Sequence, residues 1–460
     1  MPIIRPVATA DASPVTASTS ADPNLRKVAQ GAWAMYDVAN TIWSFVVVSY
    51  AIGLWLTDDA QFGVRDGNFL LSLGIVISVG LNAIVSPVLG ALSDRGGQRL
   101  PFLLAFTVLC VGATAFIADV GATGGLILFI VANFAYQASL IYYDATLKTV
   151  SQPESRGKLS GIGVAVGYLG TIFVGLAIFL LDVPVEDRFR LSSVLFAFFA
   201  IPIFMYVKEP PATAGISRAD LTSSFTQIFR TIEHARGVPG LGRFLLGRFF
   251  YSDAVNTVIV VMSVVTVHAM GLTATVANLV LLGLTVVAVA ASFGWGRLVD
   301  SWGPRRTLIT VLASWAVGLV IGGISIGVAG PLGIGMFLVA GAILGSGLGG
   351  VQVADRVFML RLSPPARLGE FFGLYGLVGK GSQVVGQLLY GLILLWTFDT
   401  LGNGAYQVAV LSLLVTMLIG AWLIWPVSDS WAGSGEIDAR ATPPPDRLAP
   451  STTSVEPPSR

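Results

Sequence analysis

Ten residues, GALSDRGGQR (Gly90–Arg99), return in altered form as GRLVDSWGPR (Gly296–Arg305) later in the chain. The two stretches share the pattern G-x-L-x-D-x-x-G-x-R and lie 206 residues apart. Each stands between two long apolar runs, so each is expected to be a polar loop that joins two helices. A pattern that returns at a fixed distance indicates an internal duplication.

Two further correspondences have nearly the same offset. The Asp-x-x-Asn-Thr pattern of Asp37–Thr41 returns 216 residues later at Asp253–Thr257. The third set, 212 residues apart, matches Pro153, Gly161 and Gly167 with Pro365, Gly373 and Gly379. Three matches at nearly one offset predict two homologous halves in parallel, which is an architecture of secondary transporters.

The composition indicates a membrane protein. Of 460 residues, 54% are hydrophobic and 12% are charged, whereas soluble domains have about 25% charged residues. Runs of about 20 apolar residues can cross a bilayer. We therefore expect an all-α polytopic membrane protein with twelve transmembrane helices in two pseudo-symmetric halves of six. The expected segments are Trp33–Thr57, Phe69–Leu92, Pro101–Ala118, Leu126–Leu147, Leu159–Leu181 and Leu191–Val207, then Phe244–Met270, Ala274–Trp295, Thr307–Val328, Leu332–Phe358, Glu370–Trp396 and Tyr406–Trp425.

These segments divide the chain into five parts. The expected parts are a disordered tail (1–29), a first six-helix bundle (30–207), a polar connector (208–241), a second bundle (242–427) and a second disordered tail (428–460). The connector has an amphipathic piece around Phe225–Ile232, which is expected to lie at the membrane surface.

The basic residues predict the orientation in the membrane. Ten lie in the loops after segments two, four, eight and ten, whereas the alternate loops hold only Arg65, Arg188 and Arg190. The ten are Arg95, Arg99, Lys148, Arg156, Lys158, Arg297, Arg305, Arg306, Arg361 and Arg367. Because basic loops stay in the cytoplasm, we expect both tails and the connector to be cytoplasmic. The expected location is a bacterial cytoplasmic membrane, and the expected form is a monomer.

Several classes of function are excluded by what the chain contains. Net charge is +1, so no nucleic-acid partner is indicated. One cysteine, Cys110, and two scattered histidines predict no metal site, no cofactor and no enzyme. The stretch FFGLYGLVGKGSQ (Phe371–Gln383) is no phosphate-binding loop, because Leu374 occupies the position that requires glycine.

The repeated loop pattern resembles the major facilitator superfamily of transporters. Three stretches, WAMYDVANT (Trp33–Thr41), PESRGKLSGIGVAVGYLG (Pro153–Gly170) and EFFGLYGLVGKGSQ (Glu370–Gln383), narrow the resemblance to the vacuole-effluxer branch, which comprises autophagy-linked amino-acid exporters and their bacterial relatives. The resemblance implies that helices one, four, seven and ten line a central cavity. Amino acids are the substrate class that it implies.

Charged residues inside these segments require a physical reason, because each costs about 2.5–3.5 kcal/mol at a helix centre. Lys380 lies about 15 Å into its helix, near the middle of a roughly 30 Å apolar core. It is expected either to bind a substrate carboxylate or counter-ion, or to form a permanent pair with Asp253 or another acid that only holds helices together. Asp37 and Asp253 are candidates for proton coupling, because removal from water disfavours a charged carboxylate. A role in gating and a fixed structural role remain as alternatives for both.

Other polar residues are candidates for binding or gating. The candidates for substrate contact are Asn40, Asn256, Gln352, Gln383 and Tyr36, and for the two asparagines contacts between helices are an equal alternative. The candidates for a cytoplasmic gate of alternating ion pairs are Asp144, Asp355 and Arg356, with Lys148 and Arg243 nearby.

The duplicated loops are expected to latch the two halves together in the outward-facing state. Asp94 would face the N-terminus of helix eleven and Asp300 that of helix five, where the helix dipole favours negative charge. Arg95, Arg99, Arg305 and Arg306 would serve as topology signals and as partners for acids.

These features favour a secondary transporter over the two other classes. A membrane enzyme would need a catalytic set, and a transporter-like receptor would have lost the charged cavity. The expected function is alternating-access transport of a small zwitterionic or anionic metabolite, an amino acid first, with H+ as a possible coupling ion. A sugar or drug is the alternative substrate, to be bound through Asn, Gln and aromatic side chains.

Overall fold

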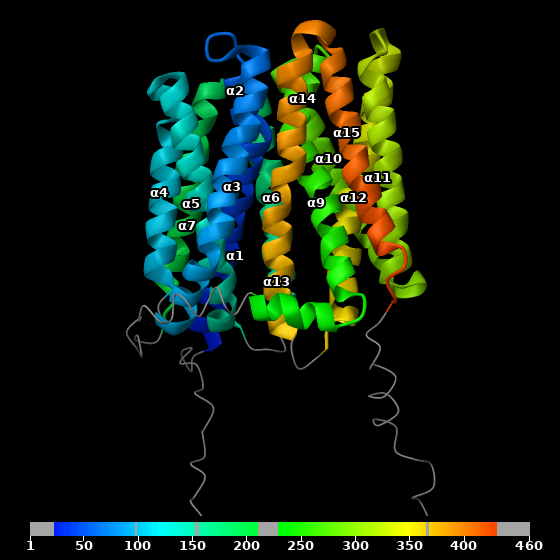
Figure 1. Ribbon diagram of the computed structural model, residues 1–460. Helices are drawn as coiled ribbons and strands as arrows, with labels where there is room; N and C mark the ends of the chain where they lie inside the picture. The colour runs from blue at the N-terminus through cyan, green and yellow to red at the C-terminus, as the bar shows by residue number, and fades with distance from the viewer. Residues whose placement is uncertain (1–22, 97–98, 152–155, 210–228, 365–367, 430–460) are drawn as a thin grey trace, which may run out of the picture.

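The protein is a bundle of long, nearly parallel helices (Figure 1). The computed structural model describes residues 23–96, 99–151, 156–209, 229–364 and 368–429, and within these ranges every regular element is helical. Eleven helices there are long and apolar enough to cross a membrane. The segment expected fifth is also a helix, but its described apolar part, Ala165–Leu180, is shorter. The all-α polytopic architecture is confirmed, and the count of twelve spans stays a prediction.

The first half is built from the elements up to α7. Its first helix begins at Pro23, inside the stretch expected to be a disordered tail, so that boundary was placed too late; residues 1–22 lie outside the described part. The elements are α1 (Pro23–Trp43), a π-helical stretch (Ser44–Ala51), α2 (Ile52–Leu56), α3 (Gly63–Gly96), α4 (Leu100–Ala115), a 3-10 turn (Ile117–Asp119), α5 (Gly121–Val150), α6 (Arg156–Leu180) and α7 (Val185–Tyr206).

The second half repeats this order. Its elements are α9 (Leu241–Val264), a π-helical stretch (Val265–Ala269), α10 (Ala274–Trp302), α11 (Pro304–Ile326), α12 (Gly330–Leu362), α13 (Leu368–Gly381), a 3-10 turn (Ser382–Val384), α14 (Val385–Leu401) and α15 (Gly404–Ile424). In each half the first long helix continues into a π-helical stretch.

Packing follows the duplication that the sequence predicts. In each half the first helix packs against the last (α1 on α7, α9 on α15), and the third packs against the fourth (α4 on α5, α11 on α12). The halves meet along two equivalent seams, α3 with α14 and α6 with α10. Glycines allow the close approach: a Cβ at Gly391 would lie 2.7 Å from the Cβ of Ser72, and one at Gly175 would lie 2.4 Å from Leu282.

Both described chain ends and the helix of residues 229–237 lie at one end of the bundle, the lower end in Figure 1, which we call the connector end. Residues 210–228 lie outside the described part, so the expected amphipathic piece is seen only from residue 229 onward. That part has Thr231 and Ala235 buried, while Phe229 is 71% exposed.

Polar contacts between the two halves gather at the opposite end of the bundle. The Tyr50 hydroxyl donates to the Ala274 carbonyl (2.6 Å), and Thr57 Oγ1 lies 2.8 Å from His268 Nε2. Arg65 Nη1 forms a 3.0 Å ion pair with Asp399. The halves are therefore joined firmly at the end away from the connector.

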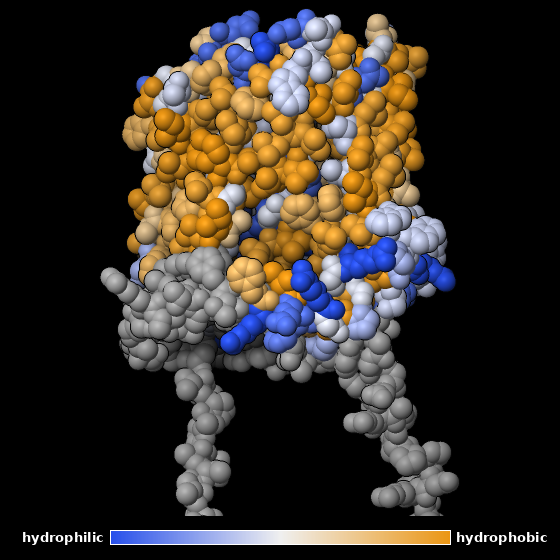
Figure 2. Space-filling model, viewed as in Figure 1, coloured by the Kyte–Doolittle hydropathy of each residue, from blue (hydrophilic) through white to orange (hydrophobic). Residues whose placement is uncertain are grey.

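The outer surface is apolar along most of its height. Figure 2 shows a broad hydrophobic belt, with hydrophilic residues gathered above and below it. Phe173, Phe198 and Trp396 are among the large side chains exposed there. A belt of this kind faces lipid, which agrees with the eleven candidate spans.

Candidate substrate chamber

A charged cavity of about 370 Å³ lies within the second half and toward the connector end. Its walls come from α9, α12, α13 and the turn that follows α13, and they carry several of the predicted residues. These are Asn256, Gln352, Asp355, Arg356, Lys380 and Gln383. Gln352 and Arg356 are exposed although they lie on a helix inside the bundle, so water reaches this cavity.

A second, mostly apolar cavity of about 350 Å³ adjoins the first, and the two share Ile259, Leu348 and Gln352. Both halves contribute to it. The first half supplies Asp37, Thr41, Ser44, Phe45, Ser49, Tyr168 and Thr171, and the second half supplies mainly Met262, Leu281, Leu284, Trp315 and Leu344. The Gln352 amide donates to the Tyr168 hydroxyl (3.3 Å) and so links the halves at this level. We call the two cavities together the chamber.

Lys380 lies in the chamber, as the sequence predicts. It stands at the end of α13, just before the 3-10 turn, and its side chain is half-buried. No ion pair joins it to another described residue, so the permanent pair with Asp253 is not seen. Asp144 of α5, in the other half, is exposed, and its charge interacts with those of Lys380 and Arg356. Opposite charges from the two halves therefore lie close enough to interact.

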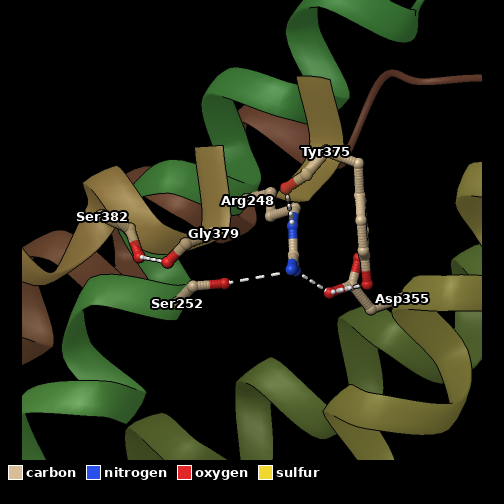
Figure 3. A network of polar contacts seen from close by, with 6 residues as sticks. All are labelled: Arg248, Ser252, Asp355, Tyr375, Gly379 and Ser382. Carbon is tan, nitrogen blue, oxygen red and sulfur yellow. Dashed lines mark hydrogen bonds and ion pairs between the residues drawn. The ribbon is translucent and has the colours of Figure 1, made fainter. Parts of the chain in front are cut away.

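Arg248 is the main site residue that the sequence analysis missed. Its Nη1 pairs with Asp355 Oδ2, and its guanidinium carbon lies 3.6 Å from the centre of the Tyr375 ring (Figure 3). The Tyr375 hydroxyl also donates to Asp355 (3.1 Å), and Ser252 lies 3.5 Å from Arg248 Nη1. Asp355 is therefore held inside the second half, by Arg248 and not by Arg356.

The position of Gly379 makes this cluster possible. A Cβ there would lie 2.8 Å from Arg248 Nη2, so any larger residue would require the guanidinium to shift away from α13. The sequence feature that could have identified Arg248 is its place in an apolar segment, five residues before Asp253. Arg243, expected near the gate, instead lies over the exposed ring of Trp422, 5.4 Å from its centre.

Asp253 is fully buried, and neither carboxylate oxygen has a hydrogen-bond partner among the described residues. A Cβ at Gly386, at the start of α14, would lie 2.7 Å from both Asp253 Oδ2 and Thr257 Oγ1. The Thr257 hydroxyl is likewise unpartnered within that part of the chain. Asp253 therefore points toward α14 of its own half, beside the chamber.

Asp37 is half-buried and lines the apolar cavity together with Thr41, whereas Tyr36 and Asn40 do not. Tyr36 is fully buried inside the first half: its hydroxyl lies 2.6 Å from Thr107 Oγ1, and its ring stacks on Tyr143. Its predicted contact with substrate is therefore wrong, because successive residues of a helix point about 100° apart. Asn40 is buried, and its amide has no partner among the described residues.

The predicted latches are seen only in part. The side chains of Asp94, Arg95 and Lys148 lie outside the described residues, while Asp300 and Arg306 are exposed at the connector end. The duplicated loops that end at Arg99 and Arg305 make a contact that was not predicted. Glu209 accepts hydrogen bonds from the backbone N–H groups of Arg99 (2.6 Å) and Leu100 (2.8 Å), and Asp429 accepts one from Arg305 N–H (3.1 Å). Each carboxylate thus stabilises the N-terminus of the third helix in its half.

The chain is similar in sequence to the members of one protein family. Residues 69–432 match the family described as "Vacuole effluxer Atg22 like". The chain is 27% identical over 417 residues to "Uncharacterized MFS-type transporter YxiO" of Bacillus subtilis, covering 85% of this chain and 92% of that one. It is 28% identical over 305 residues to Autophagy-related protein 22 of Yarrowia lipolytica, covering 58% of this chain and 50% of that one.

Solved structures show the same fold at lower identity. The nucleoside transporter NupG matches with a TM-score of 0.66 at 13% identity, over 88% of this chain and 99% of that one. The inward-open xylose transporter XylE from E. coli matches with a TM-score of 0.62 at 13% identity, over 91% and 99%. Both are described as transporters, and the likeness to them shows the fold. The chain therefore belongs to the Atg22-like vacuole effluxer family, with the major facilitator fold.

Proposed function

We propose that the protein is a secondary transporter of a small zwitterionic or anionic metabolite, with amino acids as the first class to test. The observation that carries the proposal is the wet cavity lined by Lys380 and Arg356, whose charges interact with that of Asp144 of the other half. An amine near the middle of a membrane protein needs a carboxylate, water or an anionic ligand. In this arrangement a substrate carboxylate binds Lys380, and its ammonium group lies toward Asp144 and Asp37.

Alternating access is the mechanism that we propose for this movement. It is supported by the two equivalent seams between the halves and by the polar contacts that join them at the end away from the connector. Rocking of one half against the other would break those contacts and expose the chamber on the far side.

Counterflow in proteoliposomes with a panel of amino acids tests this function. Lys380→Met should lower counterflow about 10- to 100-fold, because a hydrogen bond to a charged group contributes about 1.5–3 kcal/mol. Lys208→Met is the matched control, since Lys208 is exposed beyond the end of α7. Full activity of Lys380→Met, with normal insertion into the membrane, would end the binding-site proposal.

A sugar or nucleoside is the second candidate substrate, and the apolar cavity favours it. Gln352, Tyr168, Thr41 and Thr285 offer uncharged hydrogen-bonding groups beside the indole of Trp315. Such a substrate would exchange in the same assay while every amino acid failed. Its transport would depend on Gln352 and Tyr168 more than on Lys380.

The finer parts of the proposal concern coupling and orientation. We assign proton coupling first to Asp253, because a buried carboxylate without a partner among the described residues is costly as an anion. We propose that both chain ends and the connector are cytoplasmic, which the excess of basic residues at that end supports. A bacterial cytoplasmic membrane and a monomeric form complete the proposal.

A further inference from the structure

Two arginines converge on the last turn of α15 at the connector end, outside the chamber. Arg243 of α9 lies over the Trp422 ring, 5.4 Å from its centre. Arg305 of α11 donates through Nη2 to the Trp425 carbonyl oxygen. The two indoles are 66% and 64% exposed. Two cations and two exposed indoles from three helices therefore share one patch of surface.

This patch lies at the edge of the membrane belt. The apolar span of α15 ends at Ile424, between the two tryptophans. Figure 2 shows polar residues gathered directly below the hydrophobic belt at the foot of α11 and α15. Tryptophan is enriched at membrane–water interfaces, and arginine presents several N–H donors that suit a phosphate group.

The positive charge of the patch is only partly offset by a neighbouring acid, Asp429. Within the described ranges neither Arg243 nor Arg305 forms an ion pair, and Arg305 Nε is buried without a partner. The acid in the patch, Asp429, accepts a hydrogen bond from the Arg305 backbone N–H at the start of α11. Arg236 is exposed on the helix of residues 229–237, and its Cα lies 3.9 Å from a Cβ placed at Gly242.

We propose that this patch binds the headgroup of an anionic phospholipid. The phosphate accepts from the guanidinium groups of Arg243 and Arg305, and the indoles of Trp422 and Trp425 pack against the glycerol and upper acyl region. The exposed indoles favour a lipid over a soluble phosphate, because a free phosphate would leave them in water. Basic sites at the membrane ends of helices suit anionic lipids for the same reason.

Lipid retention by the full-length protein tests the proposal. The protein is purified in neutral detergent and titrated with phosphatidylglycerol, phosphatidylcholine or glycerol 3-phosphate, and bound lipid is counted by native mass spectrometry. Phosphatidylglycerol should be retained by the wild type. Arg243→Gln and Arg305→Gln should each weaken retention about fivefold. Trp422→Leu, which keeps an apolar group, should weaken it less.

Controls separate lipid binding from loss of the fold. Arg361→Gln removes the same charge from the last turn of α12 at the same end and should retain lipid as the wild type does. Thermal unfolding in phosphatidylcholine nanodiscs verifies that each variant is folded. Equal retention by the wild type and the Arg243→Gln/Arg305→Gln variant would overturn the proposal. Equal binding of glycerol 3-phosphate, or of phosphatidylcholine, would overturn it as well.

Discussion

We expect the Asp253 carboxylate to bind the proton that is coupled to transport. Its carboxylate is buried against Gly386 and Thr257, without a partner in the described part of the chain, so a proton bound there removes the cost of burying a charge. Asp253→Asn mimics the protonated form permanently. It should preserve counterflow of substrate and abolish uptake driven by a pH gradient, measured in the same proteoliposomes.

The control for this prediction is Asp66→Asn, which changes an exposed acid in the first turn of α3. It should leave both counterflow and gradient-driven uptake unchanged. If Asp253→Asn still accumulates substrate in response to a pH gradient, the coupling proton is held elsewhere, and Asp37 becomes the next residue to test.

Gly379 should be essential for the Arg248 cluster. An added Cβ would lie 2.8 Å from Arg248 Nη2, and that guanidinium is fixed by Asp355 and by the Tyr375 ring. Gly379→Ala should cost about 1–3 kcal/mol of unfolding free energy and lower transport. Gly381→Ala is the matched control, since a Cβ there meets nothing within 4 Å. Equal thermal stability of the two variants would contradict the cluster.

At the scale of helices, one carboxylate after the last long helix of each half should stabilise the third long helix of that half. Glu209 after α7 should stabilise α4, and Asp429 after α15 should stabilise α11. Glu209→Gln removes the charge that accepts from Arg99 and Leu100 N–H, and Asp429→Asn does the same at Arg305. Each should cost about 1 kcal/mol, measured by thermal unfolding in nanodiscs. Glu233→Gln, on the exposed face of the 229–237 helix, should have no effect. A stability of Glu209→Gln equal to that of Glu233→Gln would show that this contact contributes nothing.

Much of the helix order could be predicted from the sequence. Each membrane span is recognised from its own run of apolar residues, and the internal repeat indicates that the second half has the same order of spans as the first. The position of Lys380 near the middle of an apolar segment also indicated that it needs a charged or wet environment. Side-chain partners were harder to predict: Asp355 pairs with Arg248, which lies 107 residues away, and that pairing depends on how α9 and α12 are rotated about their axes. The rotation of α1 about its axis buries Tyr36, and that of α9 turns Asp253 toward α14, although Asp37, the counterpart of Asp253 in the repeat, lines the cavity.

At the scale of the whole molecule, the proposed mechanism requires the two halves to move as rigid bodies that are joined at one end. The equivalent seams of α3 with α14 and α6 with α10 allow each half to rotate without rebuilding its own core. The charges of the chamber lie nearer the connector end, while the contacts among Tyr50, Ala274, Thr57 and His268 close the other end. Transport by alternating access therefore requires that the closed end open in each cycle.

A cross-link at the closed end should stop this cycle. Thr57→Cys and His268→Cys, in a Cys110→Ser background that removes the chain's single cysteine, place thiols where the native side chains lie 2.8 Å apart. A short bis-methanethiosulfonate cross-linker, which joins the two thiols through disulfide bonds, should reduce counterflow to background, and a reductant that cleaves those bonds should restore it. Each single-cysteine variant, treated in the same way, should remain active. Full transport by the cross-linked protein would mean that the halves do not separate at Thr57 and His268, and substrate would then have to pass the closed end by another route.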